Sequence, residues 1–175
     1  MSALAVRLVG SVLVAAAAAG AGQEAGRRAE RRVAELRALV LAVGIVQSEV
    51  TFALTPLAEA LVRAGGAAGG EVGALLESWA VALGRGRAEP RASFRAALAG
   101  HAERLALLPD DLQPVAELVE SLGRSDRDDQ GRHLQRAGLR LGAIADRLEP
   151  EARRSARLLR ALGLLGGVAA AILVL

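Results

Sequence analysis

Apolar residues run almost unbroken at both ends of the 175-residue chain and recur at three- and four-residue steps in between. The first run, Ala3 to Ala21, is interrupted by one Arg and one Ser. As a helix it is roughly 28 Å long, close to the hydrocarbon thickness of a bilayer. The last run, Ala161 to Leu175, carries no charge and reaches about 27 Å if it begins at Leu158. We therefore predict a transmembrane helix over 1–24 and a transmembrane or membrane-inserted helix over 158–175.

Arginine clusters follow the first run and precede the last, so that both clusters face the middle of the chain. Their members are Arg27, Arg28, Arg31, Arg32 and Arg37, and then Arg153, Arg154, Arg157 and Arg160. Positive residues beside membrane segments tend to stay in the cytoplasm. The simplest topology is a hairpin in which residues 25–157 form a cytoplasmic domain. Two alternatives stay open: the arginines are only a solvated helix face, or the N-terminal run is a signal peptide cleaved near Ala21.

The periodicity between the two runs predicts helices only, and hence an all-α helical bundle of two long and several short helices. One long helix leaves the N-terminal run and continues to about Leu54, with Arg28–Arg32 and Glu35 on its exposed side. Its heptad-like stripe is Val33, Leu36, Val40, Val43, Gln47, Val50 and Leu54. The second long helix runs to the C-terminus along Leu134, Ala137, Leu141, Ile144, Leu148, Glu151, Ser155, Leu158 and Leu162. Gly138 and Gly142, four residues apart, either permit a close helix contact or reflect the Gly-rich composition.

Short helices are predicted between the two long ones, over residues 56–64, 71–83, 91–107 and 115–122. Thr55 suits a cap of the first of these, and Pro56 suits its first helical position. Gly65 to Gly70 is predicted to be a flexible loop. Trp79 shares a helix face with three leucines, which favours a core anchor over a ligand contact. Gly123 suits the left-handed position that ends a helix.

Composition narrows the possible functions mainly by exclusion. The chain is 53% hydrophobic and 2% aromatic, with no cysteine, so disulfide scaffolds, thiolate zinc sites and cysteine nucleophiles are excluded. It has no lysine, so a phosphate-binding loop ending in Gly-Lys-Ser/Thr is also excluded. A net charge of +3 gives no ground to infer nucleic-acid binding.

Candidate chemistry is sparse. Asp126 to Gly131 begins like a calcium loop, but its twelfth position is Ala137, where a bidentate Glu is required. Capping of a helix N-terminus explains these acids better. His101 and His133 have no partners at metal-ligand spacing, and each is either packed or solvated. We predict no catalytic residue, no cofactor and no metal, and hence a protein that is not an enzyme.

An ordered set of short motifs resembles the stage III sporulation protein AB family of endospore-forming bacteria. The motifs are Gln47-Ser48-Glu49-Val50, Thr55-Pro56-Leu57, Glu59-Ala60, Leu122-Gly123, Asp126, Gln130, His133-Leu134 and Gly163-Leu164-Leu165-Gly166-Gly167. An apolar N-terminal run precedes them and an apolar tail closes the chain. The set covers nearly the whole chain, although residues 65–107 depart most from the family pattern.

The resemblance implies an integral protein of the mother-cell membrane that faces the forespore. The family is similar to the platform component of type II secretion systems, and its soluble domain is an all-helical bundle. The implied partners are the secretion-type cytoplasmic ATPase of the stage III sporulation A group, other membrane subunits of the same complex, and membrane lipid, but no nucleic acid. The matching residues that we predict to fix helix ends and packing are Thr55, Pro56, Leu57, Gly123, Asp126 and Gln130.

Two other functions stay open at the level of the residues. The chain is an exported helical envelope-binding protein if its N-terminal run is cleaved. It is a soluble, Arg-rich protein that binds anionic lipid or nucleic acid if its association with membranes is sensitive to salt.

Overall fold

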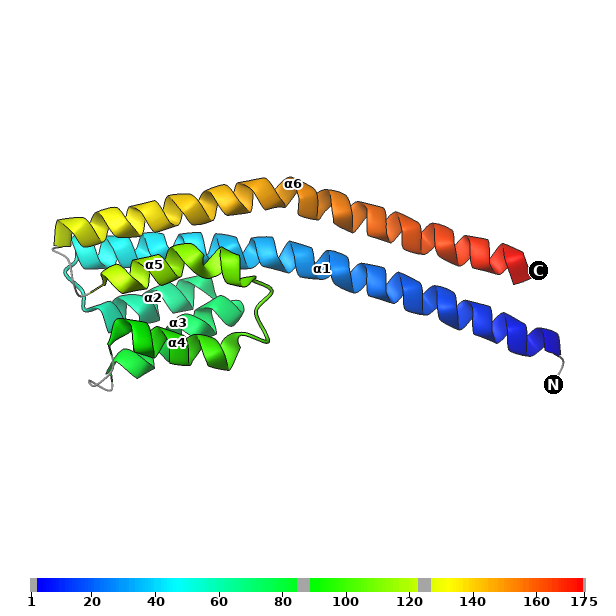
Figure 1. The fold of residues 1–175 in the computed structure, drawn as a ribbon, viewed down its shortest axis with the longest axis horizontal. Coiled ribbons are helices and arrows are strands. Elements are labelled where there is room, and N and C mark those ends of the chain that lie inside the picture. Colours follow the sequence, from blue (N-terminus) through cyan, green and yellow to red (C-terminus); the bar gives the residue numbers. More distant parts are fainter. Residues whose placement is uncertain (1–2, 85–88, 123–126, 175) are drawn as a thin grey trace. The chain divides into compact units, whose positions relative to one another are not determined.

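The computed structural model describes residues 3–84, 89–122 and 127–174, with side chains mainly over 22–84, 89–122 and 129–159. All regular structure in these residues is helical (Figure 1), which confirms the predicted all-α class with two long and several short helices. The helices are α1 (Ala3–Thr51), α2 (Leu57–Ala68), α3 (Gly70–Gly84), α4 (Pro90–His101), the short 3-10 helix η1 (Pro109–Leu112), α5 (Gln113–Ser121) and α6 (Arg127–Val174).

The chain divides into two compact units. The larger unit, residues 32–147, contains α2 to α5 together with the second part of α1 and the first part of α6. The smaller unit consists of residues 1–31 and 148–175, the two outer parts of α1 and α6.

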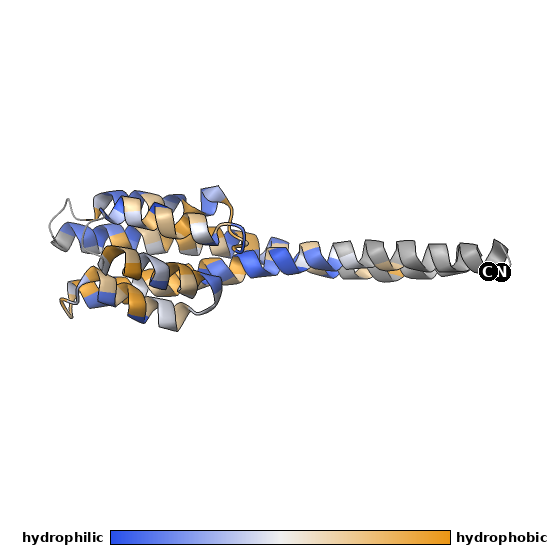
Figure 2. Cartoon of the chain, turned by 90° about the horizontal axis from the view of Figure 1, so that it is seen from below, coloured by the Kyte–Doolittle hydropathy of each residue, from blue (hydrophilic) through white to orange (hydrophobic). Residues whose placement is uncertain are grey.

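The core of the larger unit consists mainly of aliphatic side chains, together with Trp79 and Phe94. Its largest fully buried apolar side chains are Leu36, Leu39, Leu61, Val72, Leu75, Val119, Leu134 and Leu141. Figure 2 shows hydrophobic residues interspersed with hydrophilic ones along these helices. A cavity of about 30 Å³ lies where residues of α1, α2, α3, α5 and α6 meet, and its lining is wholly apolar. Burial of these apolar side chains is therefore the main force that holds the five helices together.

The buried stripe of α1 begins as predicted and then turns away from the heptad pattern. Val33, Leu36 and Val43 are buried, but Leu39 and Val46 are buried as well, at positions outside the predicted stripe. An α-helix has 3.6 residues per turn, so a strict seven-residue repeat drifts by about 20° per heptad. The core face therefore leaves the predicted register, and Leu54, its last predicted member, is 60% exposed.

Helix α6 follows an eleven-residue rather than a seven-residue spacing. Its buried residues are Leu134, Ala137, Leu141 and Ala145 in the larger unit, and Ala152 and Ala156 in the smaller one. Leu134 and Ala145, both in the larger unit, are eleven residues apart, which is about three helical turns. The predicted stripe beyond Leu141 is thus wrong, and the polar Glu151 and Ser155 are exposed.

The glycine-rich segment predicted to be a loop is instead a tight crossing of two helices. Helix α2 continues to Ala68 and α3 begins at Gly70, so that Gly65 lies inside α2 and Gly73 inside α3. A Cβ atom on Gly73 would lie only 2.5 Å from the carbonyl oxygen of Gly65. The two helix backbones therefore touch where neither residue has a side chain.

The close helix contact does not occur at the glycines that the sequence suggested. A Cβ on Gly138 would make only an ordinary contact with Val43, and one on Gly142 would meet nothing within 4 Å. In the smaller unit, by contrast, a Cβ on Gly26 would lie 3.3 Å from Cα of Ala156.

Two charged residues of α1 that were predicted to be solvated hold a distant segment in place. The Arg32 guanidinium forms two hydrogen bonds with the Asp111 carboxylate, at 2.7 and 2.8 Å, and the Asp111 side chain is only 3% exposed. The Glu35 carboxylate accepts hydrogen bonds from the backbone N–H groups of Ala106 and Leu107, at 2.7 and 3.2 Å. These bonds account for the end of α4 at His101, six residues before the predicted Leu107.

Trp79 is a core anchor, as predicted. Its side chain is 3% exposed and meets Phe94 edge-on, with ring centroids 5.0 Å apart. The indole N–H donates to the Ser93 hydroxyl at 3.1 Å, so the polar atom of this buried ring is satisfied.

Among the described residues, no helix combines the length and the apolar character needed to cross a membrane. The two transmembrane helices predicted over 1–24 and 158–175 are therefore not supported by the structure.

The glycine crossing predicts opposite effects for two alanine substitutions. Gly73→Ala should lower the free energy of unfolding by about 1–3 kcal/mol, because the new methyl group forces the backbones of α2 and α3 apart. The matched control is Gly66→Ala in the same hairpin, where a Cβ meets nothing within 4 Å and helix propensity should raise stability by about 0.5–1 kcal/mol. Urea denaturation of both variants measures the difference, and equal effects would contradict the crossing.

The Arg32–Asp111 pair predicts a loss of stability in acid. Burial alone raises the pKa of Asp111, but hydrogen bonds from Arg32 and from the Leu108 N–H outweigh it, and the pKa lies below its ordinary value. The ionised carboxylate therefore stabilises the fold above the unfolded-state pKa of about 3.9, and this contribution is lost as the pH falls through the lower folded-state pKa.

Asp111→Asn should accordingly cost about 3 kcal/mol at pH 7, because it leaves Arg32 without its ionised partner. Denaturant unfolding of the natural chain and the variant, measured from pH 7 to pH 2.5, should show the gap between them narrowing in acid. A gap that is constant with pH would exclude this role for the ion pair.

Candidate functional site

Four of the six residues predicted as structural motifs lie at one end of the larger unit. Thr55, Pro56 and Leu57 connect α1 to α2, and Gln130 lies in the first turn of α6 (Figure 1). Beside Gln130, a Cβ on Gly131 would lie 3.3 Å from the Thr51 hydroxyl oxygen, so α6 begins against the end of α1. Gly123 and Asp126 lie outside the described residues. We call residues 49–57 the α1–α2 corner.

The Glu49 carboxylate ties the corner together. Its Oε2 atom accepts a hydrogen bond from the Thr55 hydroxyl at 2.6 Å and another from Arg63 at 2.7 Å. The hydrogen bond from Thr55, followed by that from Arg63, lowers the pKa of Glu49 below its ordinary value. One carboxylate thus links the last turn of α1, the connecting segment and α2.

The predicted helix cap is wrong in its details. Pro56, rather than Thr55, occupies the N-cap position of α2, and no side chain there accepts a hydrogen bond from the helix. The Thr55 hydroxyl is a donor to Glu49 and is therefore not directed at the free N–H groups of α2. Thr55 closes the corner instead of starting the helix.

Leu54 has a backbone conformation that is costly for a side chain. Its φ is +55°, in the left-handed region that glycine normally occupies after a helix. For a residue with a Cβ, this conformation is less stable by roughly 1–2 kcal/mol. The Thr55 N–H holds it there by donating to the Glu49 carbonyl at 3.0 Å.

The corner displays two large apolar side chains to solvent. Phe52 is 81% exposed and Leu54 is 60% exposed. Sequence reasoning missed both, because it placed Leu54 on the buried stripe and gave Phe52 no role. The available signal was that Phe52, one of two phenylalanines in the chain, lies off that stripe.

A second cluster has the connectivity of a Ser–His–acid triad. The Ser78 hydroxyl lies 2.9 Å from Nε2 of His101, and Nδ1 of His101 lies 3.1 Å from the Glu71 carboxylate. Nδ1 also lies 3.1 Å from the Arg104 guanidinium, so that one ring nitrogen has both a carboxylate acceptor and a guanidinium donor beside it. The hydrogen bond with His101 is the largest cause of the lowered pKa of Glu71.

This cluster links helices and lacks the surroundings of a catalytic site. Ser78 lies within α3, where its backbone N–H belongs to the helical hydrogen-bond ladder and is not free to stabilise an oxyanion. His101 is the last residue of α4 and is only 8% exposed. The cluster therefore fastens the end of α4 to α3. Within the described residues, no three His, Asp or Glu side chains are grouped so that they could hold a metal ion.

Comparison with known proteins agrees with the resemblance seen in the motifs. A family model described as Stage III sporulation protein AB matches residues 7–175, nearly the whole chain. A solved structure of a Stage III sporulation protein AB superposes with a TM-score of 0.65 at 22% sequence identity, covering 70% of this chain and 97% of that one. At this identity the superposition shows a shared fold. No curated protein sequence matches.

The left-handed conformation of Leu54 predicts a stabilising substitution. Leu54→Gly should raise the free energy of unfolding by about 1 kcal/mol, because it relieves the backbone strain and removes a side chain that is mostly exposed. Leu54→Ala is the matched control, since it shortens the side chain but keeps the Cβ and the strain. Thermal or urea unfolding should separate the two variants, and a Gly variant no more stable than the Ala variant would refute the strain.

Proposed function

The chain belongs to the stage III sporulation protein AB family, and on that premise we propose that it is a non-enzymatic platform subunit of the secretion-like complex between mother cell and forespore that spore formation requires. In this role the helical unit of residues 32–147 serves as a rigid body to which other subunits bind.

The observation that supports this role most directly is the α1–α2 corner. Two large apolar side chains remain in water there, although folding normally buries such groups. The Glu49–Thr55–Arg63 hydrogen bonds and the strained Leu54 backbone fix this arrangement. Strain and exposed apolar surface both cost stability, and both are characteristic of sites that contact a partner.

The structural role of the Ser78–His101–Glu71 cluster, which joins two helices, supports a function without catalysis. Its groups have the order of a catalytic triad, yet they join α3 to α4 and the histidine is buried. We infer that the chain contributes binding surfaces to a complex and that chemistry, such as ATP hydrolysis, belongs to other subunits.

The proposed partners of the corner are the secretion-type cytoplasmic ATPase of the same sporulation group and the neighbouring membrane subunits. Attachment of the chain to the mother-cell membrane is part of the proposal, and its support is the apolar sequence of the two terminal runs. With that attachment, residues 32–147 lie on the cytoplasmic side, where an ATPase is available.

Spore formation in a host that lacks its own copy tests the corner. Phe52→Ala combined with Leu54→Gly should reduce heat-resistant spores at least about tenfold, because loss of two apolar contacts costs about 2 kcal/mol or more of binding free energy. The control is Val81→Ala on α3, an apolar residue that is 55% exposed, and it should leave spore numbers unchanged.

The same strains separate the proposal from its alternatives. Because Leu54→Gly relieves strain, a loss of spores cannot be attributed to unfolding if the protein level is normal. The platform role also requires that the full chain stay with the membrane after a carbonate wash. Normal spores in a strain without the chain, or full release of the chain by the wash, would refute the proposal.

A further inference from the structure

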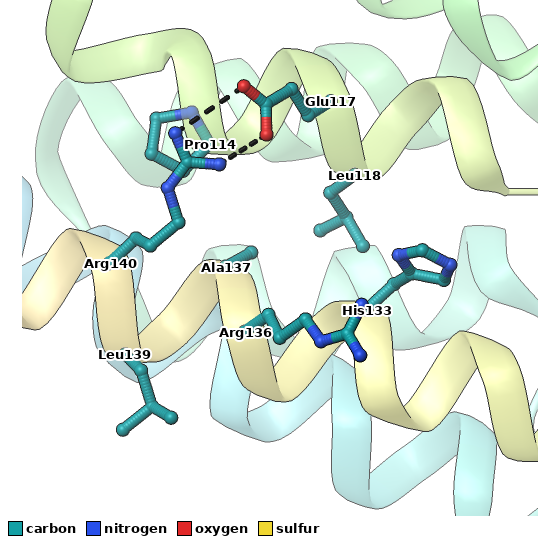
Figure 3. Close-up of a pocket in the computed structure, with 8 residues that line it drawn as sticks. All are labelled: Pro114, Glu117, Leu118, His133, Arg136, Ala137, Leu139 and Arg140. Atoms are coloured by element: carbon teal, nitrogen blue, oxygen red, sulfur yellow. Dashed lines mark hydrogen bonds and ion pairs between the residues drawn. The ribbon is translucent and has the colours of Figure 1, made fainter.

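A groove of about 520 Å³ lies between α5 and α6 in the larger unit (Figure 3). Its volume is within the range of about 300–1,000 Å³ that is typical of ligand-binding clefts. Residues from α5 form one wall and residues from α6 the other. The lining is Pro114, Glu117 and Leu118 from α5, and His133, Arg136, Ala137, Leu139 and Arg140 from α6.

The α6 wall of the groove is basic. It presents Arg136, Arg140 and the titratable ring of His133, whereas Glu117 is the only acid in the lining. Arg140 reaches across the groove and pairs with Glu117 (Figure 3). Arg136 forms no ion pair with any described residue, and its charge is one of those that lower the pKa of Asp129, seven residues earlier on α6.

The separation of Arg136 and Arg140 equals that of two residues one turn apart on a partner helix. Arg136 and Arg140 are one turn apart on α6, about 6 Å along the axis. Two carboxylates one turn apart on a second helix have the same separation, so each can pair with one of the two arginines at the same time. The contact between Arg140 and Glu117 already shows that this wall binds a carboxylate.

The groove also offers apolar surface beside its charges. Leu139 is 68% exposed on α6, next to Arg140, and Leu118 and Ala137 are buried beneath the opening. A purely anionic ligand such as phosphate would leave Leu139 uncovered. A helix that carries leucine beside its acids would cover Leu139 and pair with the arginines.

We propose that the α5–α6 groove binds an acidic amphipathic helix of a partner subunit, with two carboxylates one turn apart on Arg136 and Arg140 and an apolar side chain on Leu139. This inference rests on the proposed function, because it names the chemistry of one partner of the platform. The groove is distinct from the α1–α2 corner, with which it shares no residue.

A protein helix fits the groove better than an anionic membrane surface. A membrane is flat and presents many negative charges, so it requires a flat basic face. Here the cations line a groove whose opposite wall carries Glu117, and that acid would be repelled by a broad anionic surface. A single helix can place its carboxylates on the arginines of α6 and turn uncharged residues toward the wall that carries Glu117.

Binding of a designed peptide to the full chain tests the groove directly. The probe is a fluorescent, helix-forming peptide with Glu at i and i+4 and Leu on the same face, and its partner peptide has Lys in place of each Glu. Fluorescence anisotropy should show that the Glu peptide binds, that the Lys peptide binds at least about tenfold more weakly, and that binding weakens with added salt.

Arg136→Glu should weaken binding of the Glu peptide by about tenfold or more, since it replaces the unpaired cation with a repelling charge. The matched control is Arg95→Glu, the same change at an exposed residue of α4 outside the groove, and it should alter the affinity by less than about twofold. Arg136 is itself exposed, so the thermal unfolding midpoint should be the same in both variants.

Three outcomes would overturn the inference. Arg136→Glu and Arg95→Glu could weaken binding equally, the Glu and Lys peptides could bind equally, or vesicles of phosphatidylglycerol could bind through Arg136 when the Glu peptide does not. The last result would identify a lipid surface. Because this assay does not use spores, its failure beside a spore defect of the corner variants would remove the groove and leave the platform role intact.

Discussion

The ion pair between Arg32 and the buried carboxylate of Asp111 is the constraint on which the larger unit depends. Together with Glu35, it fixes the irregular segment of residues 105–108 and the η1 turn against α1. That segment decides where α5 begins, and α5 supplies both part of the aliphatic core and one wall of the basic groove. Because Asp111 is almost fully buried, loss of its partner would leave an uncompensated charge in the interior. A contact between residues 79 positions apart therefore sets the geometry of the surfaces that face solvent.

The two surfaces assigned to partners differ in physical character. The α1–α2 corner presents apolar side chains on a backbone that hydrogen bonds hold in a strained conformation, so its affinity would come from burial of Phe52 and Leu54. The α5–α6 groove presents cations one helical turn apart, so its affinity would be sensitive to salt. The two surfaces share no residue, so the proposed partners would make different contacts with the chain.

The sequence predicted the fold class, the two long helices and the buried Trp79, because each depends on local periodicity. It failed where distant residues decide the outcome. Arg32 and Glu35 have the spacing of a solvated helix face, and nothing in the local pattern shows their partners more than 70 positions away. The glycines from Gly65 to Gly70 have the composition of a loop, and the local pattern does not show that Gly65 meets Gly73 where α2 and α3 touch. At the candidate site, motif order located Thr55 to Leu57 and Gln130, but the exposure of Phe52 and the strain of Leu54 arise from the way α1 ends.

The alanine and glycine seam of the smaller unit has a consequence for how its two helices are held. Ala156 packs directly on Gly26, and the Leu159 side chain lies against both Gly22 and Gly26. The two glycines leave room on α1 for side chains of α6, and these close contacts contribute dispersion energy. A methyl group added at Gly26 would lie 3.3 Å from Cα of Ala156, so even the smallest enlargement there requires the two backbones to shift by a few tenths of an ångström.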